Sequence, residues 1–377
     1  MTQWQPMVKK LDSNPAPAQD ERERLRKGRA LFREGRQDEA RIEFEALLIS
    51  NPKSANAYLG LGMVLRRQER LEEALARFTQ ARTLDPLLPK AYVLEGQSLA
   101  ELDQFEPAIL AFQNALNLDP KSVKAMTGLG QVLLRQQRYE EAMALLRKAL
   151  HHDPRKVQPR LLIAEIYRQQ DQPEAAIAEL RLALDIESDH IRAAILLARL
   201  LVARNEHDPA EHVLREVLKR LPEDSPALVQ LGRAALELKL YPVAEEALHE
   251  ALRRDPGRTT TRLRLVEALL ASGKLEDAEQ QARELPKNSQ IAPLVHKLLG
   301  DIHYQRQQFQ LAVEQYRATV LHLPDHEQLL GDLERELAAS DGGWEELAED
   351  LQPSVTDRVA DETRRLRQNR RNRNRRA

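Results

Sequence analysis

Apolar residues recur along this chain at spacings of three and four residues, in two blocks per 34 residues, with polar residues between them. This spacing places an apolar stripe on one face of a helix, so each 34-residue unit is predicted to contain two amphipathic helices, helix A and helix B, joined by a turn. Nine such units follow one another without insertion from Glu21 to His326. Because one hairpin cannot bury its own apolar face, each unit is expected to pack on its neighbours.

Four positions of the unit predict close packing of its two helices. Position 8 is Gly or Ala in eight units, position 20 is Ala in all nine, and position 24 is a large apolar residue in eight. Small residues let paired helices approach, and the large residue fills the space beside them. Pro stands at position 32 in seven units and ends helix B, because it cannot continue a helix interior. Unit eight departs most, with Val266, Ala282 and Gln290 at positions 8, 24 and 32, and a local irregularity is expected there.

These residues resemble the tetratricopeptide-repeat family over residues 21–326. The resemblance implies an all-α fold, a right-handed superhelical solenoid of helix-turn-helix units in which the A helices line a concave groove. It also implies a role in binding other macromolecules, although the family has many kinds of partner. The family's Trp at position 4 is absent here; Tyr58 and Tyr92 replace it in two units, and Leu, Ala, Arg or His in others.

The remaining segments differ from the repeats in composition. Residues 1–20 are polar, contain Pro and lack periodicity, so they are expected to be disordered. Residues 327–352 are acidic and predicted to form capping helices, first over 327–337 and then around Trp344, which cover the apolar end of the array. Residues 353–377 are expected to be flexible and end in an Arg-rich tail.

Composition excludes several classes of protein. There is no Cys, so a disulfide framework, a thiolate nucleophile and a Cys-based metal site cannot exist. Aromatic residues make up only 4% and charged residues 31% of the chain, which is typical of long exposed helices rather than sheets. No stretch is apolar enough for a signal peptide or a membrane span, and a cytoplasmic location is expected.

Motifs for catalysis or for a cofactor are not found. Gly-Leu-Gly occurs at 60–62 and 128–130, but Leu65 and Leu133 replace the third glycine of a dinucleotide motif, and both lie within predicted helices. His322 and His326 have the spacing of two metal ligands on one helix, but Pro324 between them should break that helix. We therefore predict no enzyme, no metal site and no cofactor.

The predicted groove is rich in positive charge. If the family geometry holds, positions 2, 5, 9, 12 and 13 of helix A face it, and in the first seven units these positions hold twelve Arg or Lys, including Arg22, against Glu101, Glu165 and Glu237. The residues predicted to bind a partner are Arg29, Arg33, Arg66, Arg67, Lys90, Lys124, Arg135, Arg168, Arg192, Arg199 and Arg233.

Apolar residues beside these charges are expected to add contacts: Leu25, Leu59, Val93, Leu134, Leu161, Ile195, Val229 and Leu236. The complementary partner is an acidic, partly apolar protein segment, either a helix or an extended peptide. The same charges are also compatible with a hydrated helix face that binds nothing.

Some family members clamp the C-terminal carboxylate of chaperones with Lys-x-x-x-Asn on one A helix and Lys-x-x-x-Arg on another. The equivalent pairs here include Leu25 with Arg29 and Lys90 with Leu94. The clamp is therefore missing, and co-chaperone activity is not expected.

The C-terminal tail is a separate basic feature, preceded by 13 acidic residues between Asp325 and Glu362. It could anchor RNA, DNA or an acidic protein, or fold back on the acidic segment. The leading hypothesis is a protein-interaction scaffold or adaptor; the alternative is a nucleic-acid-associated factor that uses the groove and the tail, and self-association is left open. The tail residues concerned are Arg364, Arg365, Arg367, Arg370, Arg371, Arg373, Arg375 and Arg376.

Overall fold

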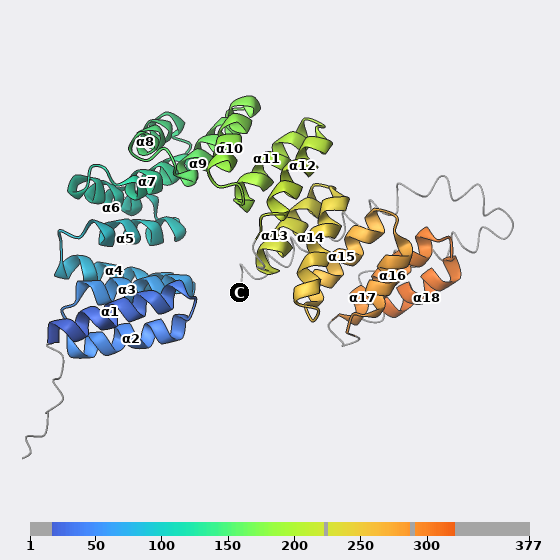
Figure 1. The fold of residues 1–377 in the computed structure, drawn as a ribbon, viewed down its shortest axis with the longest axis horizontal. Coiled ribbons are helices and arrows are strands. Elements are labelled where there is room, and N and C mark those ends of the chain that lie inside the picture. Colours follow the sequence, from blue (N-terminus) through green and yellow to red (C-terminus); the bar gives the residue numbers. More distant parts are fainter. Residues whose placement is uncertain (1–16, 222–224, 287–290, 321–377) are drawn as a thin grey trace, which may run out of the picture. The chain divides into compact units, whose positions relative to one another are not determined.

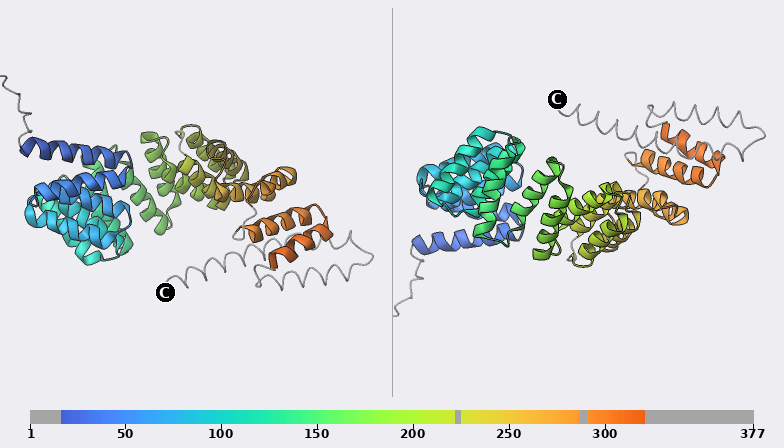
Figure 2. Two further views of the ribbon diagram at one scale, coloured as in Figure 1. Left: turned by 90° about the horizontal axis from the view of Figure 1, so that it is seen from below. Right: turned by 90° about the horizontal axis from the view of Figure 1, so that it is seen from above.

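A computed structural model describes residues 17–221, 225–286 and 291–320, and their regular structure consists of eighteen helices in nine consecutive hairpins (Figures 1 and 2). The first helix of each hairpin, the A helix, is α1 (Pro17–Arg33), α3 (Ala55–Arg67), α5 (Pro89–Glu101), α7 (Val123–Arg135), α9 (Val157–Gln169), α11 (Ile191–Ala203), α13 (Ser225–Glu237), α15 (Thr259–Ala271) and α17 (Ala292–Gln305). The second, the B helix, is α2 (Gln37–Ser50), α4 (Leu71–Leu84), α6 (Phe105–Leu118), α8 (Tyr139–His152), α10 (Pro173–Ile186), α12 (His207–Leu218), α14 (Tyr241–Arg254), α16 (Leu275–Arg283) and α18 (Phe309–Val320). The all-α class and the solenoid of helical hairpins are confirmed.

The turn between the A and B helices has the same backbone conformation in every hairpin. The residue at position 15 has a positive φ in all nine, between 56° and 81°. Only Gly35 and Gly273 are glycines; the other seven are L residues such as Glu69 and Gln137, held in a conformation that costs them energy. The hairpin geometry is therefore imposed by the packing of the two helices.

Large residues at position 24 fill the space left by small residues on the neighbouring A helices. Phe112 is 1% exposed and lies against Gly96 of its own hairpin and Gly128 of the next. A Cβ added to either glycine would lie 3.0 Å from the ring at Gly96 and 2.5 Å at Gly128, closer than normal contact. The glycines of the Gly-Leu-Gly pairs are thus packing positions.

Position 4, where the family's Trp is absent, contributes hydrogen bonds between consecutive hairpins. Tyr92 Oη donates to the carbonyl of Pro86 at 3.2 Å, Arg160 Nη2 to that of Pro154 at 3.3 Å, and Arg262 Nη2 to that of Pro256 at 3.0 Å. Each acceptor is the position-32 Pro of the preceding hairpin. Polar side chains at position 4 can therefore connect one repeat to the next.

The eighth hairpin is irregular. Its B helix α16 has nine residues and is the shortest of the described helices. Position 8 holds the larger residue, Val266, and position 24 the smaller, Ala282, and both are fully buried. The exchange of sizes conserves the packed volume, which is why this hairpin retains a core.

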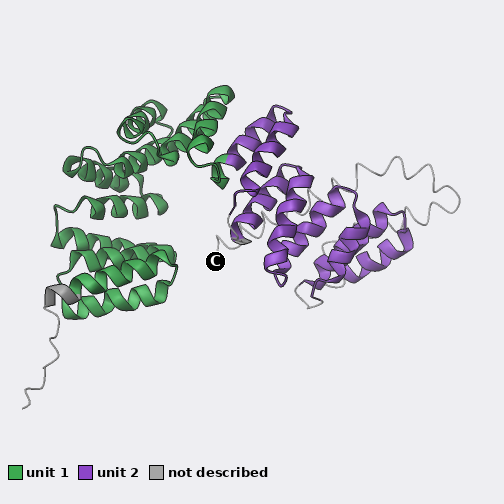
Figure 3. Cartoon of the chain, in the orientation of Figure 1, with its two compact units in different colours: residues 1–193 green, residues 194–377 purple. Residues whose placement is uncertain are grey.

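The chain divides into two compact units, residues 1–193 and 194–377, with the boundary inside α11 (Figure 3). In the first unit each A helix contacts its own B helix and the next A helix, so that α1, α3, α5, α7 and α9 lie side by side. In the second unit α13, α15 and α17 are related in the same way.

Several predicted features lie at or beyond the limits of the described residues. The segment expected to be disordered over residues 1–20 is helical from Pro17, a residue suited to the first turn of a helix. The predicted capping helices, His322, His326 and the Arg-rich tail lie outside the described residues. Within the described residues no helix is long and apolar enough to cross a membrane.

Candidate binding surface on the A helices

Hydrogen bonds between neighbouring A helices define a continuous surface on the first unit. Arg29 Nη2 on α1 donates to Asn56 Oδ1 on α3 at 2.8 Å, and Arg66 Nη1 on α3 donates to Gln97 Oε1 on α5 at 2.6 Å. Arg135 Nη1 on α7 donates to the carbonyl of Ala100 on α5 at 2.9 Å. Polar residues at positions 2, 9, 12 and 13 of successive A helices therefore share one surface, which we call the A-helix face.

Four of the predicted binding residues have acidic partners. Arg66 lies 3.7 Å from Glu101, and Arg135 lies 2.9 Å from Asp103 in the following turn. In α9, Arg168 binds Glu165 at 2.5 Å, and its hydrogen bonds hold the pKa of that carboxyl below its usual value. In α13 of the second unit, Arg233 lies 3.8 Å from Glu237. These charges are at least partly neutralised, so they offer less attraction to an acidic partner than the sequence alone predicts.

Two further residues are held by groups other than carboxylates. Arg67 donates to the carbonyl of Phe32 at 2.9 Å, and its guanidinium lies 4.8 Å from the centre of the Phe32 ring. Arg33 donates to the carbonyl of Arg29 in its own helix at 3.2 Å. Both side chains are exposed, but their orientation is set by these contacts.

Arg29, Lys90 and Lys124 form no ion pair with any described residue, as is also true of Arg33, Arg67 and Arg192; what distinguishes these three is that the charges of Arg29 and Lys124 act on Lys90. We call these three the cation cluster. Desolvation lowers the pKa of Lys90, and the charges of Arg29 and Lys124 lower it further. The charges of Arg29 on α1 and Lys124 on α7 therefore both act on Lys90 of α5.

One polar residue of this surface escaped the sequence analysis. Asn56 stands at position 2 of its unit, as Lys90 and Lys124 do, and it orients Arg29. Comparison of position 2 across the units would have identified it. Arg192 and Arg199, further along the chain, are exposed and have no ion-pair partner among the described residues; the charge of Arg192 contributes to the lowered pKa of Glu165, after the larger effect of Arg168.

Four of the eight apolar residues expected to line the groove are buried, and the other four, Leu25, Ile195, Val229 and Leu236, are half-buried. Leu59, Val93, Leu134 and Leu161 are between 2% and 6% exposed and belong to the core between the helices. Position 5, which holds Leu59, Val93 and Leu161, and position 12 at Leu134 face the neighbouring helices, because the A helices contact each other directly along this side. The A-helix face of the first unit is consequently more polar than predicted.

Two carboxylates, Glu95 and Glu245, are buried and could in principle serve as catalytic groups. Glu95 lies 3.0 Å from Arg82 and accepts a hydrogen bond from Thr79. Glu245 lies 2.5 Å from Lys274 and accepts a hydrogen bond from Ser272, and its hydrogen bond to the lysine accounts for the raised pKa of Lys274. Both carboxylates therefore tie neighbouring helices together. The described residues contain no group of three or more side chains able to hold a metal ion.

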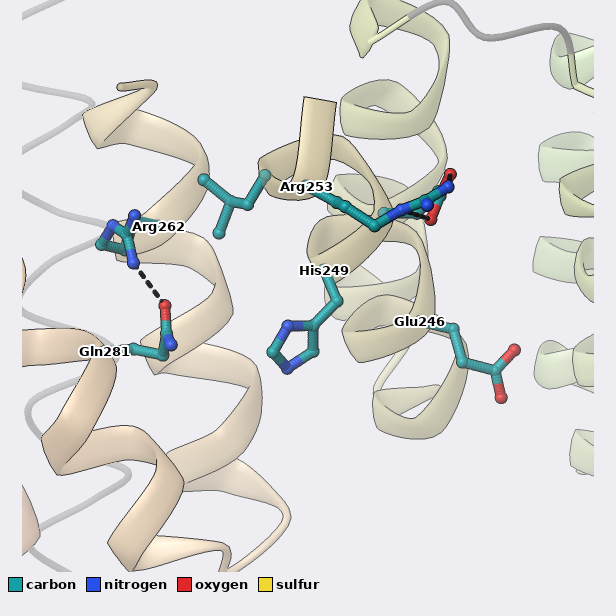
Figure 4. Close-up of a pocket in the computed structure, with 7 residues that line it drawn as sticks. Glu246, His249, Arg253, Arg262 and Gln281 are labelled. Atoms are coloured by element: carbon teal, nitrogen blue, oxygen red, sulfur yellow. Dashed lines mark hydrogen bonds and ion pairs between the residues drawn. The ribbon is translucent and has the colours of Figure 1, made fainter. Parts of the chain in front are cut away.

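A cleft of about 420 Å³ lies in the second unit between α14 and the following hairpin (Figure 4). His249 projects from α14 toward α15 and α16, while Arg262 donates to Gln281 at 2.7 Å. The ionised groups of the cleft are already paired: Glu250 accepts hydrogen bonds from Arg253 and Arg254, which lower its pKa to about 2. The cleft thus has fewer free charges than the A-helix face.

Two family models match successive parts of the chain. The family model for the C-terminal domain of cilia and flagella-associated protein 70 matches residues 2–231, and a tetratricopeptide-repeat model matches residues 235–302. A comparison with curated proteins finds no match.

Solved structures with similar folds include PilF of Pseudomonas aeruginosa, at 19% identity and a TM-score of 0.47, covering 55% of this chain and 94% of that one. A tetratricopeptide-repeat protein of Parabacteroides merdae has 18% identity and a TM-score of 0.47, covering 67% and 99%. A thermophilic tetratricopeptide-repeat protein of Thermus thermophilus has 24% identity and a TM-score of 0.43, covering 48% and 100%.

Proposed function

The chain belongs to the tetratricopeptide-repeat family whose model describes the C-terminal domain of cilia and flagella-associated protein 70, and from that premise we propose that it is a non-enzymatic scaffold that binds an acidic segment of a protein partner on its A-helix face. The observation that carries this proposal is the cation cluster: three positive charges from three helices with no carboxylate partner among the described residues.

The electrostatics of the cluster support binding of an anion. Burial lowers the pKa of Lys90, and repulsion by the positive charges of Arg29 and Lys124 lowers it further. A bound carboxylate offsets the repulsion and replaces water as the partner of the ammonium groups. The attraction also guides an acidic segment to this surface as it approaches.

The burial of the apolar residues supports an extended partner segment over an amphipathic helix. A helix that binds in a groove is held by apolar side chains at intervals of three and four residues, which need apolar surface to pack on. In the first unit Leu59, Val93, Leu134 and Leu161 do not provide that surface, because the core already covers them. Exposed polar side chains such as Gln131 and Gln158 can instead hydrogen-bond to an extended backbone.

The test measures binding of a fluorescent acidic peptide, for example eight glutamates, to the full chain at two salt concentrations. The variant Arg29→Glu/Lys90→Glu/Lys124→Glu should lose most of the affinity, because it turns the attraction into repulsion. The matched control Lys53→Glu/Lys148→Glu/Arg181→Glu makes the same change in net charge at exposed positions outside the cluster. Circular dichroism confirms that both variants fold.

Two outcomes would redirect the proposal. Equal loss of affinity in the cluster variant and in the control would mean that only net charge matters. Tighter binding of a single-stranded oligonucleotide than of the peptide, lost in the cluster variant, would favour the nucleic-acid function instead.

A further inference from the structure

We propose that residues 4–11 of this chain dock on the outer side of α2, over an apolar stripe that the described residues leave exposed to solvent. The stripe consists of Ile42, Ala46 and Ile49, and we call it the α2 stripe. This inference does not depend on the acidic-segment function, because the stripe lies on a B helix and the cation cluster lies on A helices.

The α2 stripe faces away from the core of its hairpin. Its members follow one another at spacings of four and three residues, which places them on one side of the helix. The core occupies the opposite side, where Phe44 and Leu47 are each 1% exposed. Ile42 is 58% and Ile49 is 84% exposed, and Ala46 between them is half-buried. The first hairpin therefore packs normally on one side of α2 and leaves apolar surface on the other.

Position 29 of the repeat is where α2 differs most clearly from the other B helices of the first unit. Ile49 stands at this position, and the next four repeats have Thr83, Asn117, His151 and Asp185 there. Single apolar residues on a surface are common, but two isoleucines on one side of the same helix form a contiguous apolar surface, and such surfaces are typical of interaction sites. The α2 stripe is therefore suited to be covered by another segment.

The segment that precedes α1 leaves the fold beside the α2 stripe. Side chains just after α2 bond to the beginning of α1: Asn51 Nδ2 donates to Glu21 Oε2 at 3.0 Å, and Ser54 Oγ donates to Glu21 Oε1 at 2.8 Å. The end of α2 and the start of α1 at Pro17 are therefore neighbours. Ile49 lies in the last turn of α2, so the residues before Pro17 begin close to it.

This segment contains apolar side chains that suit the stripe. Trp4, Met7, Val8 and Leu11 follow one another at spacings of three, one and three residues, which is the pattern of one side of a helix. The run is too short to establish a period over the whole segment, so composition alone predicts disorder there. Docking on α2 replaces that expectation for residues 4–11.

Charges on the two surfaces are complementary. Asp38 and Glu45 each stand four residues before an isoleucine of the stripe, so they lie on or beside it, and both are exposed. Among the described residues Asp38 forms no ion pair, and Glu45 lies 3.8 Å from Arg41. Lys9 and Lys10 stand among the apolar residues of the docking segment and supply the opposite charge.

The length of the segment suffices for this contact. From its first to its last isoleucine the stripe spans about 10 Å of α2, and residues 4–11 span the same length as a helix. Pro6 falls in the first turn of such a helix, where Pro is tolerated. Residues 12–16 reach up to about 17 Å when extended, so the chain can reverse its direction before α1. Because the segment is covalently attached, a contact too weak to form between separate molecules is sufficient.

The test uses Trp4 as a reporter in the full chain, with Trp344→Phe so that Trp4 is the only tryptophan. Docking should move its fluorescence emission to shorter wavelength and protect it from quenching by acrylamide, because the indole ring leaves water for an apolar contact. Ile42→Asp/Ile49→Asp should abolish both effects, since it places two charges under the apolar side chains of the segment.

The matched control is Leu110→Asp/Asn117→Asp on α6. It makes the same change in net charge at the equivalent repeat positions, 22 and 29, of the third hairpin. The emission and the quenching of Trp4 should be unchanged in this control. Circular dichroism confirms that both double variants fold, which is expected because all four positions are exposed.

Three outcomes would overturn the inference. A Trp4 that is fully exposed to acrylamide before any change to α2 would show that the segment does not dock. A protected Trp4 that is unaffected by Ile42→Asp/Ile49→Asp would place the segment elsewhere. Protection that disappears on dilution, together with a doubled molar mass in light scattering, would assign the stripe to a second copy of the chain. None of these outcomes changes the binding of an acidic peptide to the A-helix face.

Discussion

The packing of Phe112 between two hairpins makes a specific prediction for Gly128→Ala. An ideal Cβ at Gly128 would lie 2.5 Å from two atoms of the Phe112 ring, whereas carbon atoms in contact normally lie about 3.5–4.0 Å apart. The ring has little room to move away, because Phe112 is buried and also packs against Gly96. This second contact is so close that a Cβ added to Gly96 would lie 3.0 Å from the ring. The substitution therefore forces the third and fourth hairpins apart.

Two effects of opposite sign set the magnitude. Alanine is favoured over glycine in a helix interior by about 1 kcal/mol, and overpacking of a close core costs about 1–3 kcal/mol. We expect a net loss of about 1 kcal/mol in the free energy of unfolding, since the steric cost exceeds the gain in helix propensity. In a Phe112→Leu background the clash is relieved, and Gly128→Ala should become neutral or stabilising. The chain already contains this combination one repeat further on. Leu146 stands at the position equivalent to Phe112, and Leu162 in the unit after it stands at the position equivalent to Gly128.

The assay is urea unfolding of the four proteins of this double-mutant cycle, followed by circular dichroism at 222 nm. Hydrogen exchange of peptides from α6 and α7, with α2 as a distant control, locates the change. A coupling free energy of about 1 kcal/mol or more between the two sites is expected. Gly128→Ala that stabilises both backgrounds equally would refute the reasoning and show that the ring accommodates the added methyl group without cost.

Three further predictions follow from single residues. Gly35→Ala should lower the free energy of unfolding by about 1–2 kcal/mol because Gly35 has a φ of 81°; an added Cβ would meet no other atom there, so the cost comes from the backbone alone. Glu69→Gly, at a φ of 62°, should be neutral or stabilising, and an equal change in thermal unfolding for both variants would count against this reasoning. The affinity for an acidic peptide should decrease as the pH is raised, at a pH below the one expected for an ordinary lysine, because Lys90 binds only when charged and its pKa is lowered. Lys90→Arg should move this decrease in affinity to higher pH. A pH profile that does not move would exclude Lys90 as the source of the decrease. Ionised Glu250 stabilises the fold above its ordinary pKa of 4.5, and this contribution should be lost as the pH falls toward 2. In an acid titration of the folded state followed by circular dichroism, Glu250→Gln should reduce the loss of stability between these pH values. An unchanged titration below pH 4.5 would show that Arg253 and Arg254 do not stabilise the carboxylate.

The helical hairpins could be predicted from the sequence because they depend on local and repeated patterns. The spacing of apolar residues, the invariant Ala at position 20 and the pairing of small and large residues at positions 8 and 24 recur in one register. Each pattern acts within one hairpin or between adjacent ones, so its physical meaning does not depend on distant parts of the chain. The irregularity at Val266 and Ala282 was visible for the same reason.

The candidate site depended on the tertiary structure. Arg29, Arg66 and Arg135 look alike in the sequence, but Arg66 lies near Glu101 and Arg135 near Asp103, residues more than thirty positions away, while Arg29 meets only the amide of Asn56. Whether a charge is neutralised depends on distances between side chains on different helices, and these distances are fixed only when the helices pack. The sequence by itself therefore determined the repeat, its core and the excess of positive charge along the A helices. Only the packed structure decided which of those charges remain without a partner and which apolar residues are covered.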